Sequence, residues 1–185
     1  MTRAFQKIAF THSVKAAQKR YGNRQTYNVS EDDTELRDSL TQNEISFLSD
    51  RDSFYMATVG ENGWPYVQHR GGPKGFLKVL DENTIGFADF RGNKQYISVG
   101  NMNTDDRVML FLMDYPHRLR LKIWAHSQIF HPEDAPEQLT SLINQNYAGH
   151  IERCIILKIA AFDWNCAQHI TPRYSKTDIE AMILD

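Results

Sequence analysis

A run of hydrogen-bond donors passes into a glycine-rich loop at residues 68–76, Gln-His-Arg-Gly-Gly-Pro-Lys-Gly-Phe. Glycine lets the backbone approach a ligand closely and point N–H groups at an anion. His69 and Arg70 would add an imidazole and a guanidinium to such a site, with Gly71 and Gly72 in its loop. The spacing and the absent Lys-Ser/Thr ending exclude a P-loop. A Gly-Pro turn with surface charges is the alternative interpretation.

A second polar loop carries Arg91, Asn93 and Lys94, directly before a segment expected to be helical over residues 95–101. A helix N-terminus attracts anions through its free N–H groups and its dipole. The loop therefore qualifies as a second part of an anion site. The alternative is a solvated loop that ends in a helix cap.

Basic side chains alternate along residues 118–124. Arg118, Arg120, Lys122 and Trp124 would share one face of a strand there. Cations in such a row repel one another and need solvent, an acidic partner or a bound anion. A solvent-exposed outer face is the commoner explanation.

The segment 162–174 brings a large ring, amides, an imidazole and a guanidinium together just after a strand. Trp164 and Arg173 are its candidates for ligand contact, although a tryptophan there could equally belong to the core. Cys166 lies close to His169 in sequence, but no third group orients the pair, which argues against a thiol nucleophile.

Seven segments with strand character must position these groups. Asn62-Gly63 and Asp81-Glu82-Asn83 supply turns between two pairs of them. The strands are expected at 54–60, 64–70, 76–80, 84–88, 107–113, 119–125 and 155–162. Six or seven short strands joined by tight turns predict a closed or nearly closed antiparallel barrel.

Helices are expected around this barrel. Residues 13–21 are good helix formers that stop at Gly22-Asn23. A capping-box pattern at Thr41–Glu44 predicts a short helix over 41–50, and another helix is expected from near Pro136 to Ile143. We expect one domain, residues 41–185, with an N-terminal helical extension over residues 1–40.

The bulk composition is that of an ordinary globular protein: 185 residues, 41% hydrophobic and 24% charged, with a net charge of −2. Scattered basic residues argue against nucleic acid or membrane partners. No apolar stretch reaches the roughly 20 residues that span a bilayer, and the N-terminus lacks the core of a secretory signal. Cys154 and Cys166 match no zinc site and are expected to be reduced thiols in the cytoplasm, with one disulfide as the alternative.

In this order, the four segments resemble the FMN-binding split-barrel family of pyridoxamine 5′-phosphate oxidase over about residues 40–175. The resemblance is strongest to a subgroup of oxidase-related flavin proteins. Its marks are His-Arg-Gly-Gly-Pro at 69–73, Phe-Ala-Asp-Phe-Arg-Gly-Asn-Lys-Gln at 87–95, the tail 163–173 and the opening 10–18. The resemblance implies a mainly β (β+α) fold, an antiparallel six- to seven-stranded Greek-key split barrel with flanking helices.

The resemblance also implies that FMN lies at the interface of a homodimer. His69, Arg70 and the following loop would contact its phosphate and ribityl chain, and Asn93 and Lys94 its phosphate. Ala88 and Asp89 would lie along the isoalloxazine ring. The full implied set is His69, Arg70, Gly71, Gly72, Phe76, Ala88, Asp89, Asn93, Lys94, Gln95, Arg120, Trp164 and Arg173. The resemblance places Arg120, Trp164 and Arg173 against a flavin held mainly by the other subunit.

One departure from the oxidase bears on the substrate. The oxidase has an Arg-x-His pair before its final arginine, whereas this chain has His169 and Thr171 before Arg173. We therefore expect an FMN-dependent oxidoreductase for a different small molecule, with no residue declaring itself as the general acid or base. His69 and His169 are the candidates. The alternatives are a non-catalytic flavin-binding or flavin-sensing protein, a haem-binding relative and a deazaflavin (F420) relative.

Overall fold

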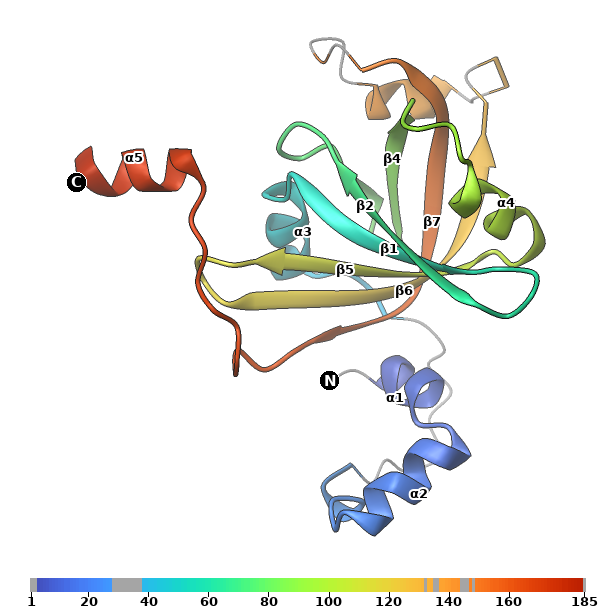
Figure 1. The fold of residues 1–185 in the computed structure, drawn as a ribbon, viewed down its shortest axis with the longest axis vertical. Helices are drawn as coiled ribbons and strands as arrows, with labels where there is room; N and C mark the ends of the chain where they lie inside the picture. The colour runs from blue at the N-terminus through green and yellow to red at the C-terminus, as the bar shows by residue number, and fades with distance from the viewer. Residues whose placement is uncertain are drawn as a thin grey trace.

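Seven antiparallel strands form one curved sheet in the computed structural model, which describes residues 3–27, 38–131, 133–134, 137–143, 147 and 149–184. The sheet order is β2-β1-β5-β6-β7-β4-β3 (Figure 1). The strands are β1 (Ser53–Val59), β2 (Pro65–Gly71), β3 (Lys78–Asp81), β4 (Thr84–Phe90), β5 (Arg107–Asp114), β6 (Leu119–Phe130) and β7 (Ile151–Trp164). The expected strands and the mainly β split-barrel fold are confirmed.

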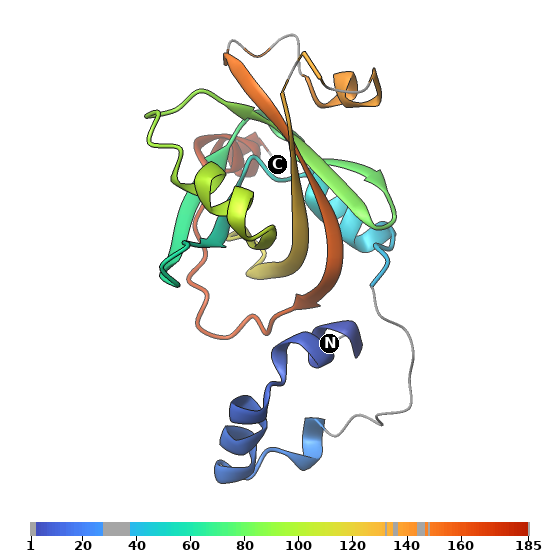
Figure 2. The same ribbon diagram turned by 90° about the vertical axis from the view of Figure 1, so that its right-hand side faces the viewer.

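Helices flank the sheet on several sides. They are α1 (Arg3–Ala9), α2 (His12–Arg20), η1 (Gln25–Tyr27), α3 (Gln42–Ser49), α4 (Ile97–Thr104), η2 (Glu137–Leu142) and α5 (Lys176–Leu184). In both views α2 extends away from the barrel, and α5 projects from it in Figure 1 (Figures 1 and 2). No described helix is long and apolar enough to cross a membrane.

Several helix predictions are confirmed with shifted boundaries. The expected helices over 13–21 and 41–50 correspond to α2 and α3, and Gly22 has the positive φ of 75° that suits a residue after a helix end. The helix expected at Gln95 begins two residues later, as α4. The segment after Pro136 is the 3₁₀ helix η2, and Pro136 itself lies outside the described residues. Helix α5 was not expected from the sequence.

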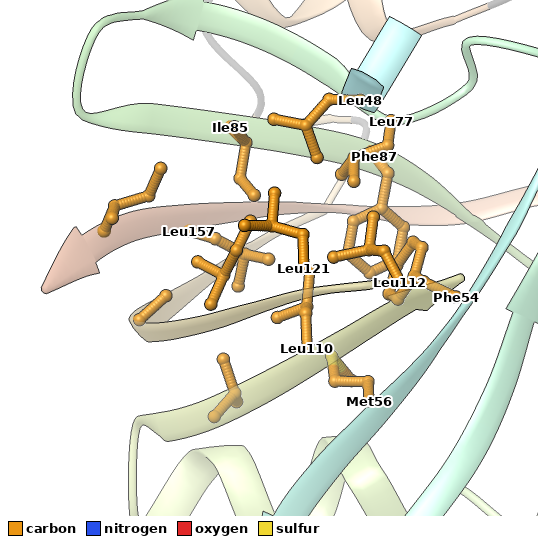
Figure 3. Packing of buried hydrophobic residues seen from close by; sticks show 14 of the residues in the cluster. Leu48, Phe54, Met56, Leu77, Ile85, Phe87, Leu110, Leu112, Leu121 and Leu157 are labelled. Carbon is orange, nitrogen blue, oxygen red and sulfur yellow. The ribbon is translucent and has the colours of Figure 1, made fainter. Parts of the chain in front are cut away.

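The core fills the inside of the barrel. Alternate residues of β5 point inward, so Val108, Leu110 and Leu112 are buried. They meet leucines and isoleucines from β6 and β7, together with Leu48 of α3 (Figure 3). Phe54 stacks on Phe76 with ring centroids 5.5 Å apart and meets the ring of Phe87 edge-on.

The outer face of β6 is not the solvent-exposed cationic face that the sequence favoured. Helix α1 covers it, and the Phe5 ring packs on Trp124 with centroids 5.0 Å apart. Lys122 lies over both rings, and its Nζ is 3.4 Å from Asp163. Arg118 falls in the turn before β6 at φ 56°, so it does not belong to the row. The rings of Phe5 and Trp124 and the carboxylate of Asp163 therefore stabilise the charge of Lys122, which offsets the repulsion expected along this row.

The N-terminus of α3 is fixed by the buried carboxylate of Glu44. The predicted capping box is present, with the Thr41 backbone N–H donating to Glu44 Oε2 at 2.9 Å. The other oxygen, Oε1, accepts a 2.6 Å bond from Trp164 Nε1 on β7. Burial alone would raise the pKa of Glu44, but the hydrogen bonds from Thr41 and Trp164 lower it below its ordinary value. One carboxylate thus caps a helix and ties it to the sheet.

We expect Glu44→Ala to lower the free energy of unfolding by about 2–4 kcal/mol, because it removes a helix cap and leaves a buried indole N–H unpaired. Glu44→Gln, which keeps an acceptor, should lose less. Since the folded-state pKa of Glu44 is depressed, the carboxylate stabilises the fold above its unfolded-state pKa, and this contribution disappears as the pH falls through the folded-state pKa. Urea unfolding at several pH values measures both effects. An equal loss for Ala and Gln, unchanged at acid pH, would contradict the role given to the carboxylate.

Candidate functional site

A buried ion cluster joins β2, β4 and β7 at one end of the barrel. Arg70 of β2 forms an ion pair with Oδ1 of Asp89 on β4. Arg153 of β7 donates to Asp89 Oδ2 at 2.9 Å. The Asp89 side chain is only 4% exposed and that of Arg153 only 9%. Since β2 and β4 are not neighbours among the described strands of the sheet, the Arg70–Asp89 pair spans the split between them.

A second carboxylate extends this cluster toward solvent. Glu152 Oε2 accepts a 2.6 Å bond from Arg153, and its Oε1 accepts 3.0 Å bonds from Arg91 Nε and Tyr96 Oη. Burial raises the pKa of Asp89 above its ordinary value, and the charges of Arg70 and Arg153 oppose that shift. For Glu152, burial would also raise the pKa, but the bonds from Arg91 and Tyr96 hold it below its ordinary value.

A small pocket of about 40 Å³ opens beside these charges. Strands β2, β4 and β7, the loop 91–94 and the start of α4 surround it. Asn93 and Lys94 line it from the loop, and Ser98 from the first turn of α4, where its hydroxyl donates to Gln68 Oε1 at 2.9 Å. The helix N-cap, Tyr96, makes no side-chain capping bond. The first N–H groups of α4 therefore remain available to an acceptor in the pocket.

The backbone that leads into α4 adopts an unusual conformation. Lys94 and Tyr96 both have positive φ, 61° and 54°. Non-glycine residues rarely adopt this region, and such strain persists where surrounding contacts enforce it. Tyr96 is held by its bond to Glu152 and by the Arg153 guanidinium, which lies 5.1 Å from the ring centroid. The ion cluster thus fixes the loop that carries Lys94.

The charges of the cluster do not balance. The cations are Arg70, Arg91, Lys94 and Arg153, and the carboxylates are Asp89 and Glu152. Four cations against two carboxylates leave two positive charges uncompensated. Arg70 Nε is moreover buried and has no hydrogen-bond partner among the described residues. A buried donor without a partner is costly, and an acceptor from a bound anion would remove that cost. The pocket therefore suits an anion with about two negative charges.

The structure brings part of the predicted site together. Arg70 and the separate segment that carries Asp89, Asn93 and Lys94 all line this pocket. Eight described residues that line it are not in the predicted set, namely Gln68, Phe90, Gly92, Tyr96, Ser98, Val99, Glu152 and Arg153. One signal was present: a Glu-Arg pair lies near the start of β7, directly before a run of apolar residues. Charged residues at the start of a buried strand usually need partners.

Six other predicted residues of these segments do not line the pocket. His69 projects to the opposite face of β2 from Arg70, where its ring meets Tyr55 at 5.6 Å. The Gly72 N–H donates to Asp52, and Phe76 is a core residue. The remaining three, Gly71, Ala88 and Gln95, also lie outside the pocket lining. The glycine-rich loop thus shapes the core in this chain, because a side chain at Gly72 would lie 2.7 Å from the Phe76 ring.

Arg120, Trp164 and Arg173 lie away from the pocket. Trp164 faces the core against Phe47, at 4.8 Å between ring centroids. Arg120 lies opposite Met113 in the β5–β6 ladder, and its Nε is buried without a partner among the described residues. Arg173 packs over the Tyr115 ring at 5.1 Å. Cys154 and Cys166 are both free thiols, and no group of three metal-binding side chains occurs in the described part of the chain.

Comparisons with known proteins identify relatives of this fold. The model of the pyridoxamine 5′-phosphate oxidase family matches residues 40–165. A candidate pyridoxamine 5′-phosphate oxidase from Lactobacillus delbrueckii has 21% identity and a TM-score of 0.51, covering 68% of this chain and 93% of that one. Group A Streptococcus HupZ has 12% identity and a TM-score of 0.50, with 73% and 100% covered.

A third solved structure with this fold comes from Clostridium acetobutylicum. This protein, related to general stress protein 26 of B. subtilis, has 11% identity and a TM-score of 0.50, with 74% and 94% covered. No curated protein matches the chain. At these identities the solved structures establish the fold, and the family model covers the pocket residues from Gln68 to Arg153.

We expect Asp89→Ala to lower the free energy of unfolding by about 3–5 kcal/mol, because two buried guanidinium groups lose their shared counter-charge. Asp50→Ala is a matched control, since it removes the exposed pair with Lys74, whose side chains are 69% and 56% exposed. Its cost should be about 0–1 kcal/mol. Chemical denaturation gives both values. A similar small cost for both variants would show that the Arg70–Asp89 pair does not hold the two strands together.

Proposed function

This chain belongs to the pyridoxamine 5′-phosphate oxidase family, and we propose that it binds FMN by placing the flavin phosphate in the pocket beside Arg70 and Lys94. We further propose that the loaded protein is an oxidoreductase for a small molecule. The single observation that carries the proposal is the uncompensated positive charge of the ion cluster at the open start of α4.

A phosphate monoester matches that observation in charge and in donors. It carries about 1.5 to 2 negative charges at neutral pH and presents several strong acceptor oxygens. Arg70 Nε, the Lys94 ammonium, the Asn93 amide and the first N–H groups of α4 are the donors of this chain for it. Each charge-assisted bond would contribute about 1.5–3 kcal/mol. A neutral ligand would leave the cluster charge unbalanced.

The rest of the cofactor would lie along β4 beside Ala88 and Asp89. Bound FMN supplies hydride or electron transfer through its ring system, while the protein supplies position and electrostatics. His169 and Thr171 stand where the family's oxidase holds its substrate with arginine and histidine, so we do not propose vitamin B6 oxidation. The substrate we propose is a different small molecule.

A homodimer would complete the site, and the outer face of the sheet favours one. Val67, Ala57 and Met109 lie side by side across β2, β1 and β5, and His69, Tyr55 and Phe111 form the next row. Val67 and Tyr55 are 58% and 40% exposed, which is unusual for neighbouring apolar residues. His69 and Arg120 both lie on this outer face, so a second subunit packed there would contact them.

Lys94→Gln should weaken FMN binding about tenfold or more, because one charge-assisted bond to the phosphate is lost. Riboflavin has no phosphate, so its affinity should change little. Lys74→Gln is the matched control, since that lysine of the glycine-rich loop pairs with Asp50 instead. Titration monitored by flavin fluorescence measures all three affinities. Equal losses for FMN and riboflavin would refute the phosphate assignment.

The visible spectrum of the purified protein separates the remaining alternatives. Flavin bands, with FMN released on denaturation, are expected. Reduction by NADH or NADPH followed by reoxidation in air would favour an enzyme over a passive flavin-binding protein. A Soret band would point to haem, and deazaflavin absorption would point to an F420 protein. A folded, colourless protein without affinity for added FMN would contradict the proposal.

A further inference from the structure

A second cavity, unlike the anion pocket, lies on the other side of α4. This groove has a volume of about 570 Å³ and runs between the β1–β2 turn and the helix. Its size falls within the range of small-molecule sites, about 300–1,000 Å³. Trp64 and Tyr66 line one side, Ile97 and Asn101 the other, and Glu61 stands in the turn. The anion pocket and this groove share β2 and α4 but no lining residue.

Three polar or aromatic side chains in the groove have no partner among the described residues. Within the described part of the chain, the side chains of Glu61, Trp64 and Tyr66 form no hydrogen bond, ion pair or ring contact. Trp64 is 74% exposed, a large exposure for an indole. Trp64 directly precedes β2 and Tyr66 is its second residue, and both side chains line the groove. The groove thus offers two aromatic rings and a carboxylate to a ligand.

Both walls of the groove are rigid. In the turn, Gly60 N–H donates to the Trp64 carbonyl at 2.9 Å, and Trp64 N–H donates to Asn62 Oδ1 at 3.1 Å. Gly63 supplies the positive φ of 83° that this tight turn requires. On the other side, Asn101 Nδ2 donates to Thr58 Oγ1 at 2.9 Å and fixes α4 to β1. Binding therefore does not have to order the backbone of the turn or the position of the helix.

The electrostatics of the groove select a cation. Among the described residues that line the groove, Glu61 is the single charged one, and it is negative. The faces of indole and phenol rings also carry negative potential, so they attract ammonium groups. An anion would meet repulsion from both. The groove therefore has the opposite preference to the anion pocket 
on the far side of α4.

We propose that this groove binds an organic cation, a quaternary ammonium group carried on a small apolar molecule. Trp64 and Tyr66 contact the ammonium group through their ring faces, and Glu61 supplies the counter-charge. Ile97, which is 39% exposed, contacts the apolar part. The site uses none of the residues assigned to FMN, so it stands whether or not the chain binds a flavin.

Choline and its neutral isostere 3,3-dimethyl-1-butanol are the probes that test this proposal. In the ¹⁵N-labelled protein, the indole signal of Trp64 should shift in a saturable way with choline, and the neutral alcohol should bind at least about fivefold more weakly, as expected for about 1 kcal/mol of cation–π attraction. Trp64→Leu keeps an apolar side chain and should weaken choline binding by a similar factor. For this variant, saturation-transfer signals of choline report the binding.

Matched variants distinguish choline binding in the groove from general electrostatic attraction and from binding at the flavin site. Glu61→Gln should weaken choline binding about two- to fivefold, whereas Glu82→Gln, the same change in the β3–β4 turn, should leave it unchanged. Lys94→Gln should retain choline binding even where it loses FMN. Equal affinity for choline and the alcohol, no saturation up to about 100 mM, or insensitivity to Trp64→Leu and Glu61→Gln would each overturn the proposal. So would sedimentation showing that Trp64→Leu converts a dimer to a monomer, because a second copy would then occupy the groove.

Discussion

The ion pair between Arg70 and Asp89 is the interaction on which the rest of the site depends. It joins β2 to β4, two strands that share no backbone ladder among the described strands, and so it spans the split in the barrel. Burying a lone carboxylate in this position would be prohibitively costly. The second guanidinium, from Arg153, supplies further hydrogen bonding and extends the cluster to β7. The contacts that join the strands across the split therefore also assemble the pocket.

From this pair the organisation of the pocket follows outward. Arg153 holds Glu152, and Glu152 in turn holds Arg91 and Tyr96, which fixes the strained segment before α4. That segment places Lys94 at the mouth of the pocket and leaves the first turn of α4 without a side-chain cap. A chain of charge-assisted bonds thus connects the buried Asp89 carboxylate to a site near the surface that has excess positive charge. The site is preorganised because three of its four cations, Arg70, Arg91 and Arg153, are already held by carboxylates.

Helix α4 separates two cavities of opposite electrostatic character. Its first turn faces the cationic pocket through Ser98, whereas Ile97 and Asn101 face the groove beside Trp64. Residues on the same face of β2 serve the two cavities, Tyr66 in the groove and Arg70 in the pocket. The short helix α4, which Asn101 fixes to β1, therefore contributes residues to both cavities. The apolar outer face of β2, β1 and β5 lies on the opposite side of the sheet.

The sequence by itself determined the strands, the capping box at Thr41–Glu44 and the family, because these depend on local periodicity and on motifs contiguous in the chain. The alternation of side chains along a strand also predicts that His69 and Arg70 lie on opposite faces of β2. The motif resemblance nevertheless assigned both residues to the same site. Tertiary structure alone decided that Arg70 meets Asp89 and Arg153, and that α1 covers Lys122. Periodicity sets the side of a strand on which a residue lies, but which residue it meets across a split depends on how the whole sheet curves.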